Sequence, residues 1–285
     1  MSIRQMCWQV AIRKRRKGLF YDTEFPFTVI PNPPRKWAAD PFIIERDNRL
    51  FIFAELYPFA GGKGEIGYCV LEGGHITNWT IILDKQYHLS YPYIYEYDNN
   101  VFIMPESGQR GTIDIYRAER FPDQWIKECT LVEGKVYVDS TFINQNTLIT
   151  YNENNRELYY LRINRENEKA SLIKKVSDEY SHLRPGGKVL NIKGKRIRPS
   201  QIGEKYYGAA LAFREIEFIN EEYVEREIFK INPGKLTIKG IHRKICGVHT
   251  YNCTANFEVI DIQYKKFSLS GFWSRALSKA RRLLV

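Results

Sequence analysis

The sequence predicts an all-β protein, a five-bladed β-propeller whose blades are four-stranded antiparallel sheets. Two stretches of sixteen residues, 40–55 (DPFIIERDNRLFIFAE) and 91–106 (YPYIYEYDNNVFIMPE), follow the same pattern. Each alternates aromatic and branched residues on both sides of an Asp-Asn or Asn-Asn pair, which is typical of a β-hairpin. Weaker copies begin at Asp139, Arg184 and His249. An internal repeat of this kind indicates a ring of similar units.

The length of the repeat gives the content of each unit. Successive units begin 45 to 65 residues apart, and most of these steps suit one propeller blade. In the first two units, residues 66–83 and 113–131 read as two further strands with a Trp at matching places. Residues 8–12 read as a strand that can pair with the last unit and close the ring, which removes exposed sheet edges. We therefore expect one propeller over residues 1–270.

The C-terminal residues 271–285 depart from the strand pattern. Their apolar side chains fall on one helical face, and Arg275, Lys279, Arg281 and Arg282 lie outside it. This pattern predicts a short basic amphipathic helix. Such a helix can pack on the propeller or lie on a membrane, and we favour a peripheral membrane contact through residues 272–285.

The net charge limits the classes of binding partner that we expect. A net charge of +10 attracts phosphate-bearing small molecules, anionic membranes or nucleic acid. The aromatic residues fall at strand spacing, which predicts a hydrophobic core rather than a base-stacking surface. We therefore expect no nucleic-acid partner.

Three features predict a cytoplasmic protein, held by its tail at the inner face of the cell membrane. No run of about 18 uncharged apolar residues is present. The N-terminus has neither the apolar core nor the cleavage site of a secretory signal. The five cysteines are odd in number and lack paired spacing, which fits a reducing compartment.

The hairpins also predict a polar site at one end of the propeller. The first and last residues of a hairpin return to the same end, and the innermost strands line the central channel. Unit starts and hairpin ends therefore converge on one mouth. The residues expected there are Asp40, Asp139, Arg184, His249, Glu55, Glu106, Arg198 and Gln201. By their positions, His88, Tyr207 and Trp37 should lie nearby, although His88 and Trp37 also suit a structural role.

Several short motifs occur in an order that points to a known family. They are WAADPFI, HLSYPYIY, MPES, VDSTF, RPGGK, RPSQ, YYGAA and HTYN. Over residues 8–262 the chain resembles the propeller domain at the N-terminus of plant glucosamine inositolphosphorylceramide transferases, also found in bacterial cell-envelope sugar proteins. That family belongs with the five-bladed arabinanase, levansucrase and invertase-like propellers.

The resemblance implies roles for three carboxyl groups. In the hydrolase relatives an Asp opening blade one acts as base or nucleophile, which Asp40 matches. An Asp in blade three orients it, which Asp139 matches. The acid in blade four is missing, because that unit opens with Arg184. An ordinary glycoside needs this acid, whereas a nucleoside diphosphate leaves without protonation if cations neutralise it. Glu55 or Glu106 could still act as an acid from another blade.

This departure favours a glycosyltransferase that moves a sugar from a nucleotide-diphosphate donor to a cell-envelope glycan or a lipid-linked acceptor. Asp40 would deprotonate the acceptor hydroxyl, and Asp139 would hold Asp40 or a sugar hydroxyl. Arg184 and Arg198 would hold the diphosphate. The other residues expected to contact substrate are Trp37, Glu55, His88, Gln201, Tyr207 and His249. The alternatives are a hydrolase or phosphorylase with Glu106 as the acid, and a non-catalytic carbohydrate-binding module. No D-x-D motif, phosphate loop or zinc spacing appears, so we expect no metal and no cofactor.

Overall fold

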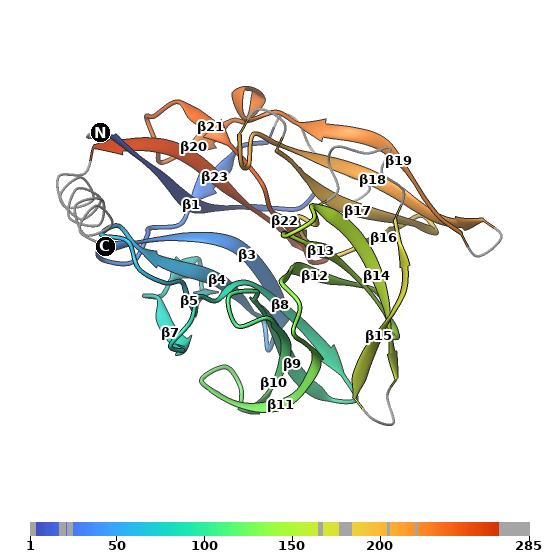
Figure 1. The fold of residues 1–285 in the computed structure, drawn as a ribbon. Coiled ribbons are helices and arrows are strands. Elements are labelled where there is room, and N and C mark those ends of the chain that lie inside the picture. The colour runs from blue at the N-terminus through green and yellow to red at the C-terminus, as the bar shows by residue number, and fades with distance from the viewer. Residues whose placement is uncertain are drawn as a thin grey trace, which may run out of the picture.

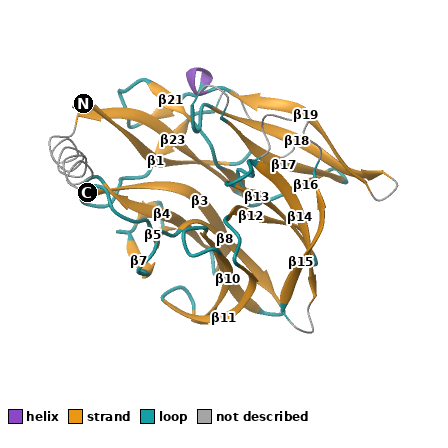
Figure 2. Cartoon of the chain, in the orientation of Figure 1, coloured by secondary structure: helices purple, strands orange, loops and turns teal. Residues whose placement is uncertain are grey.

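The chain folds into a ring of five β-sheets, as the sequence predicts (Figure 1). The computed structural model describes residues 4–16, 21, 25–164, 168–176, 184–203, 206–219 and 222–267. Strands dominate this part of the chain, whose only helical element is the short 3-10 turn η1 (Pro233–Lys235) (Figure 2). The five-bladed all-β prediction is confirmed. The predicted C-terminal helix and the tail 271–285 lie outside the described residues.

Each of the first four blades is an antiparallel meander that runs outward from the centre of the ring. Blade one contains β3 (Lys36–Arg46), β4 (Arg49–Pro58) and β5 (Glu65–Glu72), which pairs with both β6 (His75–Ile76) and β7 (Thr80–Leu83). Blade two contains β8 (Ser90–Tyr97), β9 (Asn100–Ser107), β10 (Thr112–Arg120) and β11 (Gln124–Glu133). Blade three contains β12 (Tyr137–Asn144), β13 (Thr147–Asn152), β14 (Glu157–Asn164) and β15 (Lys169–Lys175). Blade four contains β16 (Leu190–Ile192), β17 (Lys195–Ile202), β18 (Ala210–Ile219) and β19 (Glu222–Ile231).

Blade five joins the two ends of the described chain. It contains β21 (Ile245–Gly247), β22 (Tyr251–Cys253), β23 (Phe257–Phe267), β1 (Arg4–Lys14), β2 (Phe27–Val29) and β20 (Ile238–Lys239). Strands β1 and β23 pair antiparallel along their whole length, with Trp8 opposite Gln263. The predicted pairing of the Trp8 segment with the last unit is therefore confirmed, and it closes the ring.

The tight turns of the repeated hairpins mark the end of the propeller that lies away from the site. Asp47 and Asn48 have φ angles of 50° and 58°, and Asp98 and Asn99 have 48° and 59°. Two successive positive φ angles are typical of the type I′ turn, which matches the twist of a two-residue hairpin. The starts of β3 and β8 and the ends of β4 and β9 consequently lie at the opposite end, the mouth end.

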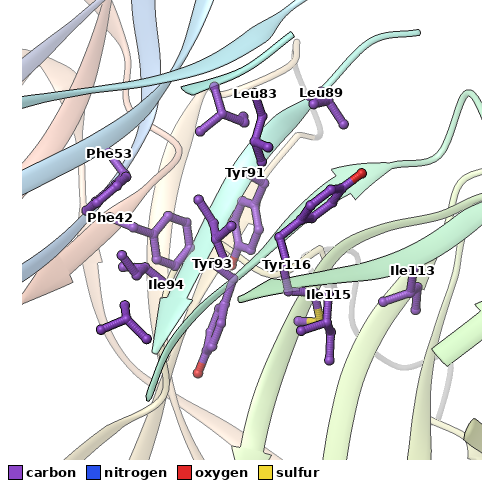
Figure 3. Packing of buried hydrophobic residues seen from close by; sticks show 14 of the residues in the cluster. Phe42, Phe53, Leu83, Leu89, Tyr91, Tyr93, Ile94, Ile113, Ile115 and Tyr116 are labelled. Atoms are coloured by element: carbon purple, nitrogen blue, oxygen red, sulfur yellow. The ribbon is translucent and has the colours of Figure 1, made fainter. Parts of the chain in front are cut away.

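The core lies between neighbouring blades. Its largest cluster joins blades one, two and three, and Figure 3 shows Phe42, Tyr91 and Tyr93 at its centre. The ring of Tyr91 meets that of Phe42 edge to face, with the two centroids 4.8 Å apart. These large side chains fix how one blade packs on the next. In the part of the chain that the structure describes, no helix has the length and apolar character needed to cross a membrane.

Candidate active site

A β-bulge recurs near the start of the innermost strand in the first three blades. The strand register shifts between Ala39 and Phe42, between Ser90 and Tyr93, and between Val138 and Thr141. Inside each bulge one residue adopts a positive φ: Asp40 at 50°, Tyr91 at 43° and Asp139 at 51°. This conformation costs a residue with a side chain about 1–2 kcal/mol. A bulge re-aims the side chain it carries, and such strain is often found at functional sites.

Asp40 is buried among polar partners. The Thr250 hydroxyl donates to its Oδ1 at 2.7 Å, and its own backbone N–H donates to Asp261 Oδ2 at 3.0 Å. His249 Nε2 lies 3.5 Å from the same Oδ1. Burial raises the pKa of Asp40 to about 6, with nearby Asp139 and Asp261 adding to the rise and His249 opposing it. The carboxyl therefore titrates close to neutral pH.

His249 lies between two carboxylates. Its Nδ1 is 2.6 Å from Asp261 Oδ2, and its ring stacks on Trp8 with the centroids 3.9 Å apart. Burial alone lowers the pKa of His249, but Asp261 and Asp40 raise it by more, so the pKa lies above its ordinary value. A protonated imidazole here balances part of the buried negative charge.

Asp40, His249 and Asp261 also have the chemistry of a divalent cation site, because one ligand atom from each lies within 4.8 Å of the others. Protein donors already occupy most of these oxygens. Asp261 Oδ1 accepts the backbone N–H groups of His249 and Thr250 at 3.0 Å each, and Asp261 Oδ2 accepts that of Asp40. The Asp261 oxygens thus already accept backbone N–H groups, and the arrangement resembles an ion-pair network more than a set of metal ligands.

Asp139 anchors the second half of the site. Its Oδ2 accepts Gln201 Nε2 at 2.8 Å and also accepts the Nε–H of Arg184. The Arg184 guanidinium reaches two more carboxylates, with Nη2 at 3.6 Å from Glu106 Oε2 and Nη1 at 3.2 Å from Glu153 Oε1. Burial raises the pKa of Glu106 well above its ordinary value, Asp139 adds to the rise, and Arg184 opposes it. Its surroundings therefore favour the protonated form of Glu106.

Glu55 and His88 face each other on the blade-one side of the mouth. His88 Nδ1 accepts the backbone N–H of Gly64 at 2.8 Å, so the neutral ring carries its proton on Nε2, 3.5 Å from Glu55 Oε1. Burial lowers the pKa of His88, and burial together with the neighbouring carboxylates Asp40 and Glu106 raises that of Glu55. Both shifts favour the neutral forms, which argues against a full ion pair between the two side chains.

Two aromatic groups border the mouth. Tyr207 is 48 % exposed, and its ring meets His249 edge to face at 5.1 Å, while the Arg184 guanidinium lies 5.3 Å from its centroid. Trp37 is partly exposed and stacks on Tyr57 at 4.8 Å. Flat exposed rings of this kind can pack against a sugar or a base.

Arg198 lies apart from this group. It is fully buried, and its Nη2 lies 2.9 and 2.8 Å from the two carboxylate oxygens of Glu225. Glu225 lies on β19, the outermost strand of blade four, and also binds Arg214 of β18 at 2.9 Å. The expectation that Arg198 lies at the mouth is therefore corrected, because its guanidinium is committed to a buried ion pair inside the blade. The other ten predicted site residues converge at the mouth end.

Sequence reasoning missed Asp261, Thr250, Trp8 and Glu153. Asp261 stands in the alternating run VIDI, which reads as an ordinary strand, and Thr250 follows His249 in a motif that drew attention to the histidine. One signal was available, because an acidic residue inside an apolar strand is seldom buried unless it is paired. That rule alone would have marked Asp261 as a functional or structural anchor.

Comparison with known families gives one match that covers most of the chain. The family described as "Glucosamine inositolphosphorylceramide transferase 1, N-terminal" matches residues 29–249. A protein named glucosamine inositolphosphorylceramide transferase 1 from Oryza sativa subsp. indica is 31 % identical over 210 residues, which cover 67 % of this chain and 28 % of that protein. Its Arabidopsis thaliana namesake is 33 % identical over 113 residues, or 39 % of this chain and 15 % of that protein. The chain thus spans under a third of the length of these relatives.

Several solved structures with a similar fold are glycoside hydrolases. The catalytic domain of the Coprinopsis cinerea GH62 alpha-L-arabinofuranosidase superposes with a TM-score of 0.55 at 11 % identity, covering 81 % of this chain and 92 % of that one. The exo-beta-1,3-galactanase from Phanerochaete chrysosporium superposes with a TM-score of 0.53 at 8 % identity, covering 80 % of this chain and 60 % of that one. At such low identities the likeness concerns the fold alone.

Proposed function

The chain belongs to the family of the N-terminal part of glucosamine inositolphosphorylceramide transferase 1, and we propose that its propeller transfers a sugar from a nucleotide-diphosphate donor to an acceptor hydroxyl. The observation that carries the proposal is the mouth itself. There a buried carboxyl that titrates near neutral pH, Asp40, lies in one cluster with Arg184, a cation on the solvent side. A base and a stabiliser of the leaving group are the two functions that such a transfer needs.

In this proposal Asp40 is the general base. A base works best when its pKa lies near the working pH, and the value of about 6 meets that condition. The Thr250 hydroxyl holds Oδ1 of Asp40, and the Asp40 backbone N–H is held by Asp261. The other carboxylate oxygen, Oδ2, is therefore the one that receives the proton of the acceptor hydroxyl. Asp139 and Gln201 then act as positioning residues, since both hold the Arg184 side of the cluster.

Arg184 stabilises the departing diphosphate. Two of its three carboxylate partners, Asp139 and Glu106, are largely buried, whereas the Glu153 side chain is 57 % exposed. An entering diphosphate can therefore displace Glu153 from Nη1 at little cost and take over a charge-assisted hydrogen bond. Tyr207, beside the same guanidinium, offers a face for the sugar or the base of the donor.

The acceptor in this proposal is a glycan or a lipid-linked sugar of the cell envelope, modified at the cytoplasmic face of the membrane. All five cysteines are free thiols in the structure, which supports a reducing compartment. The proposed peripheral contact of residues 272–285 would bring the mouth to such an acceptor.

A thermal-shift screen with nucleotide sugars tests donor binding, because a ligand that binds the folded state raises its melting temperature. We expect one nucleotide sugar to stabilise the protein and Arg184→Gln to abolish the shift. Arg110→Gln is the matched control, since Arg110 also lies over a tyrosine, at 5.4 Å from the Tyr87 centroid, but has no part in the cluster. No shift with any nucleotide sugar, or an equal loss in both variants, would reject the proposal.

One observation favours a second candidate, a glycoside hydrolase. The raised pKa of Glu106 suits a general acid, and the acid is the group that blade four lacks. Under this alternative, Glu106→Gln should slow the release of poor leaving groups, such as methanol, far more than that of nitrophenol, which needs no protonation. Glycan binding without turnover in either assay would instead identify a carbohydrate-binding module.

A further inference from the structure

The net positive charge of this protein comes from one blade and the tail that follows it in the sequence. Residues 1–31 and 232–285, which comprise blade five and the C-terminal tail, hold 16 Lys and Arg against 4 Asp and Glu. The remaining residues, 32–231, hold 27 against 29. The net charge of +10 therefore comes entirely from blade five and the tail, while the other four blades are close to neutral. Of the acids in 232–285, Glu258 and Asp261 are both buried, so neither offsets this charge at the surface.

The mouth end of blade five gathers several of these cations around two surface hollows. One hollow of about 610 Å³ is lined by Arg243, Lys244, Cys246, Lys265 and Phe267. The second, of about 630 Å³, shares Arg243 and includes His242 and Lys266. None of the residues lining either hollow is acidic. We call Arg243, Lys244, Lys265, Lys266, Met6 and Phe267 the blade-five patch.

In the described part of the chain, the patch cations form no ion pair with a carboxylate, unlike several cations of the other blades. Lys36, Lys63 and Arg117 each form an ion pair with a neighbouring carboxylate. Two of the patch cations, Lys266 and Arg243, instead contact rings or a main-chain oxygen. Lys266 Nζ lies 4.2 Å from the Phe59 ring centroid, and Arg243 Nη1 donates to the Lys265 carbonyl at 3.2 Å. Their charge is therefore available to an external anion.

Apolar groups are exposed among these charges. Phe267 is 59 % exposed and Met6 38 % exposed. They lie close together, because β1 and β23 run side by side (Figure 1), with Met6 opposite Lys265 and Arg4 opposite Phe267 in the strand register. Apolar side chains that protrude from a basic surface suit the boundary between lipid headgroups and acyl chains. A nucleic acid would also bind the cations of the patch, but it would offer no apolar partner for Met6.

The patch lies at the same end of the propeller as the candidate active site. Along β23, Lys265 lies four positions after Asp261, a distance of about 13 Å in an extended strand. Gln5, beside the patch, donates to the Phe59 carbonyl in the loop that follows β4 at the mouth. The chain leaves the described region at Phe267 and continues into residues 268–285, which contain four Lys or Arg and no acid. Charge thus extends from the patch into the tail sequence.

From these observations we propose that the blade-five patch is a docking surface for an anionic membrane, which holds the mouth toward the lipid surface. The cations bind phosphate-bearing headgroups, and Met6 and Phe267 enter the interface. The membrane then lies beside Arg184 and Tyr207 rather than against the tight turns at the opposite end. Docking does not depend on the sugar transfer proposed above, so either can fail without the other.

Co-sedimentation of the full chain with vesicles tests this surface. We expect binding to phosphatidylglycerol–phosphatidylcholine vesicles, little binding to phosphatidylcholine alone, and weaker binding at high salt. Each cation near an anionic surface contributes about fivefold to partitioning, so the triple variant Arg243→Gln, Lys244→Gln, Lys265→Gln should bind about 100-fold more weakly. Phe267→Ser should cause a further loss that low salt does not restore, because an apolar contact is not screened.

A second triple variant provides the matched control. Arg120→Gln, Lys135→Gln, Lys193→Gln removes the same charge from exposed positions outside blade five and should bind vesicles as the parent does. Equal loss in both triple variants would show that net charge alone drives binding and would overturn the proposal, as would equal binding to neutral vesicles. Retention on duplex DNA or RNA that the patch variant loses, with no vesicle binding, would assign the patch to nucleic acid instead. Unchanged melting temperatures for both triple variants would exclude misfolding as the cause.

Discussion

Blades one and two contain the same bulged hairpin, but the residue in the bulge has a different role in each blade. In blade two the bulge carries Tyr91, whose hydroxyl accepts the Gly187 N–H at 2.8 Å and lies 2.8 Å from Thr141 Oγ1. This one side chain therefore ties blade two to blades three and four. In blade one the equivalent position carries Asp40, whose neighbours are the ionisable groups His249 and Asp261.

The comparison shows that the backbone conformation at this position is part of the fold, whereas the side chain there sets its role. The positive φ and the register shift occur in both blades, so the ring requires the bulge whatever residue occupies it. The side chain then decides between a link that stabilises neighbouring blades and a charge held in a costly environment. Substitution of Asp40 should accordingly raise stability and lower activity, whereas substitution of Tyr91 should lower stability.

The largest stability effect is expected at Asp40. The folded pKa of about 6 lies above the unfolded value of 3.8, so the ionised carboxylate destabilises the fold above pH 6 and has no such effect below pH 4. Asp40→Asn removes this cost, and it should raise the free energy of unfolding at pH 8 by up to about 3 kcal/mol. Urea titrations at pH 8 and pH 4 check the sign, since the gain should vanish at the lower pH. A loss of stability at pH 8 would contradict the idea of a costly charge.

Tyr91→Phe should have the opposite effect. It removes the acceptor of the buried Gly187 N–H, and an unsatisfied buried donor costs about 1–3 kcal/mol. Chemical denaturation at pH 7 measures the loss. Tyr206→Phe is the control, because the Tyr206 hydroxyl also binds a main-chain carbonyl, that of Cys246 at 2.6 Å, but at an exposed site where about 0.5 kcal/mol or less is expected. Equal losses at both sites would show that Tyr91 does not link the blades.

The smallest expected effect is a shift in pH dependence at His249. The imidazole lowers the pKa of Asp40, so His249→Gln should raise it and move the acidic limb of the pH–rate profile toward higher pH. Activity well above that limb should change much less, because His249 acts through Asp40. An unshifted limb with a uniformly lower rate would indicate direct contact with substrate or a purely structural role.

The sequence was informative where local patterns decide the structure. Alternating residues around Asp47–Asn48 and Asp98–Asn99 predicted the hairpins, and the hairpins predicted that Asp40, Asp139 and Glu106 lie at one end. The ring closure through the Trp8 strand followed from the need to cover sheet edges, and the register confirms it.

The remaining features depend on tertiary contacts. Arg198 and Gln201 occur in one motif, but residues three apart in a strand point to opposite faces, so only Gln201 reaches Asp139 while Arg198 binds Glu225. Asp261 receives its role from the backbone N–H groups of His249 and Thr250, between β21 and β22, which no local pattern in VIDI reveals. The bulge at Asp40 is likewise invisible in the sequence, because it is a property of pairing.

The central claim is that Asp40 is the base of a sugar-transfer reaction at the mouth, and Asp47 offers a close control. Both aspartates have a φ of 50° and lie in the same hairpin, but Asp47 occupies the exposed turn at the opposite end. Once a nucleotide sugar that binds has been found, its turnover should be compared in Asp40→Asn and Asp47→Asn. Loss of a general base lowers the rate by about 10²- to 10⁴-fold, so the first variant should lose at least about 100-fold and the second almost nothing. Full turnover in a correctly folded Asp40→Asn protein would contradict the assignment.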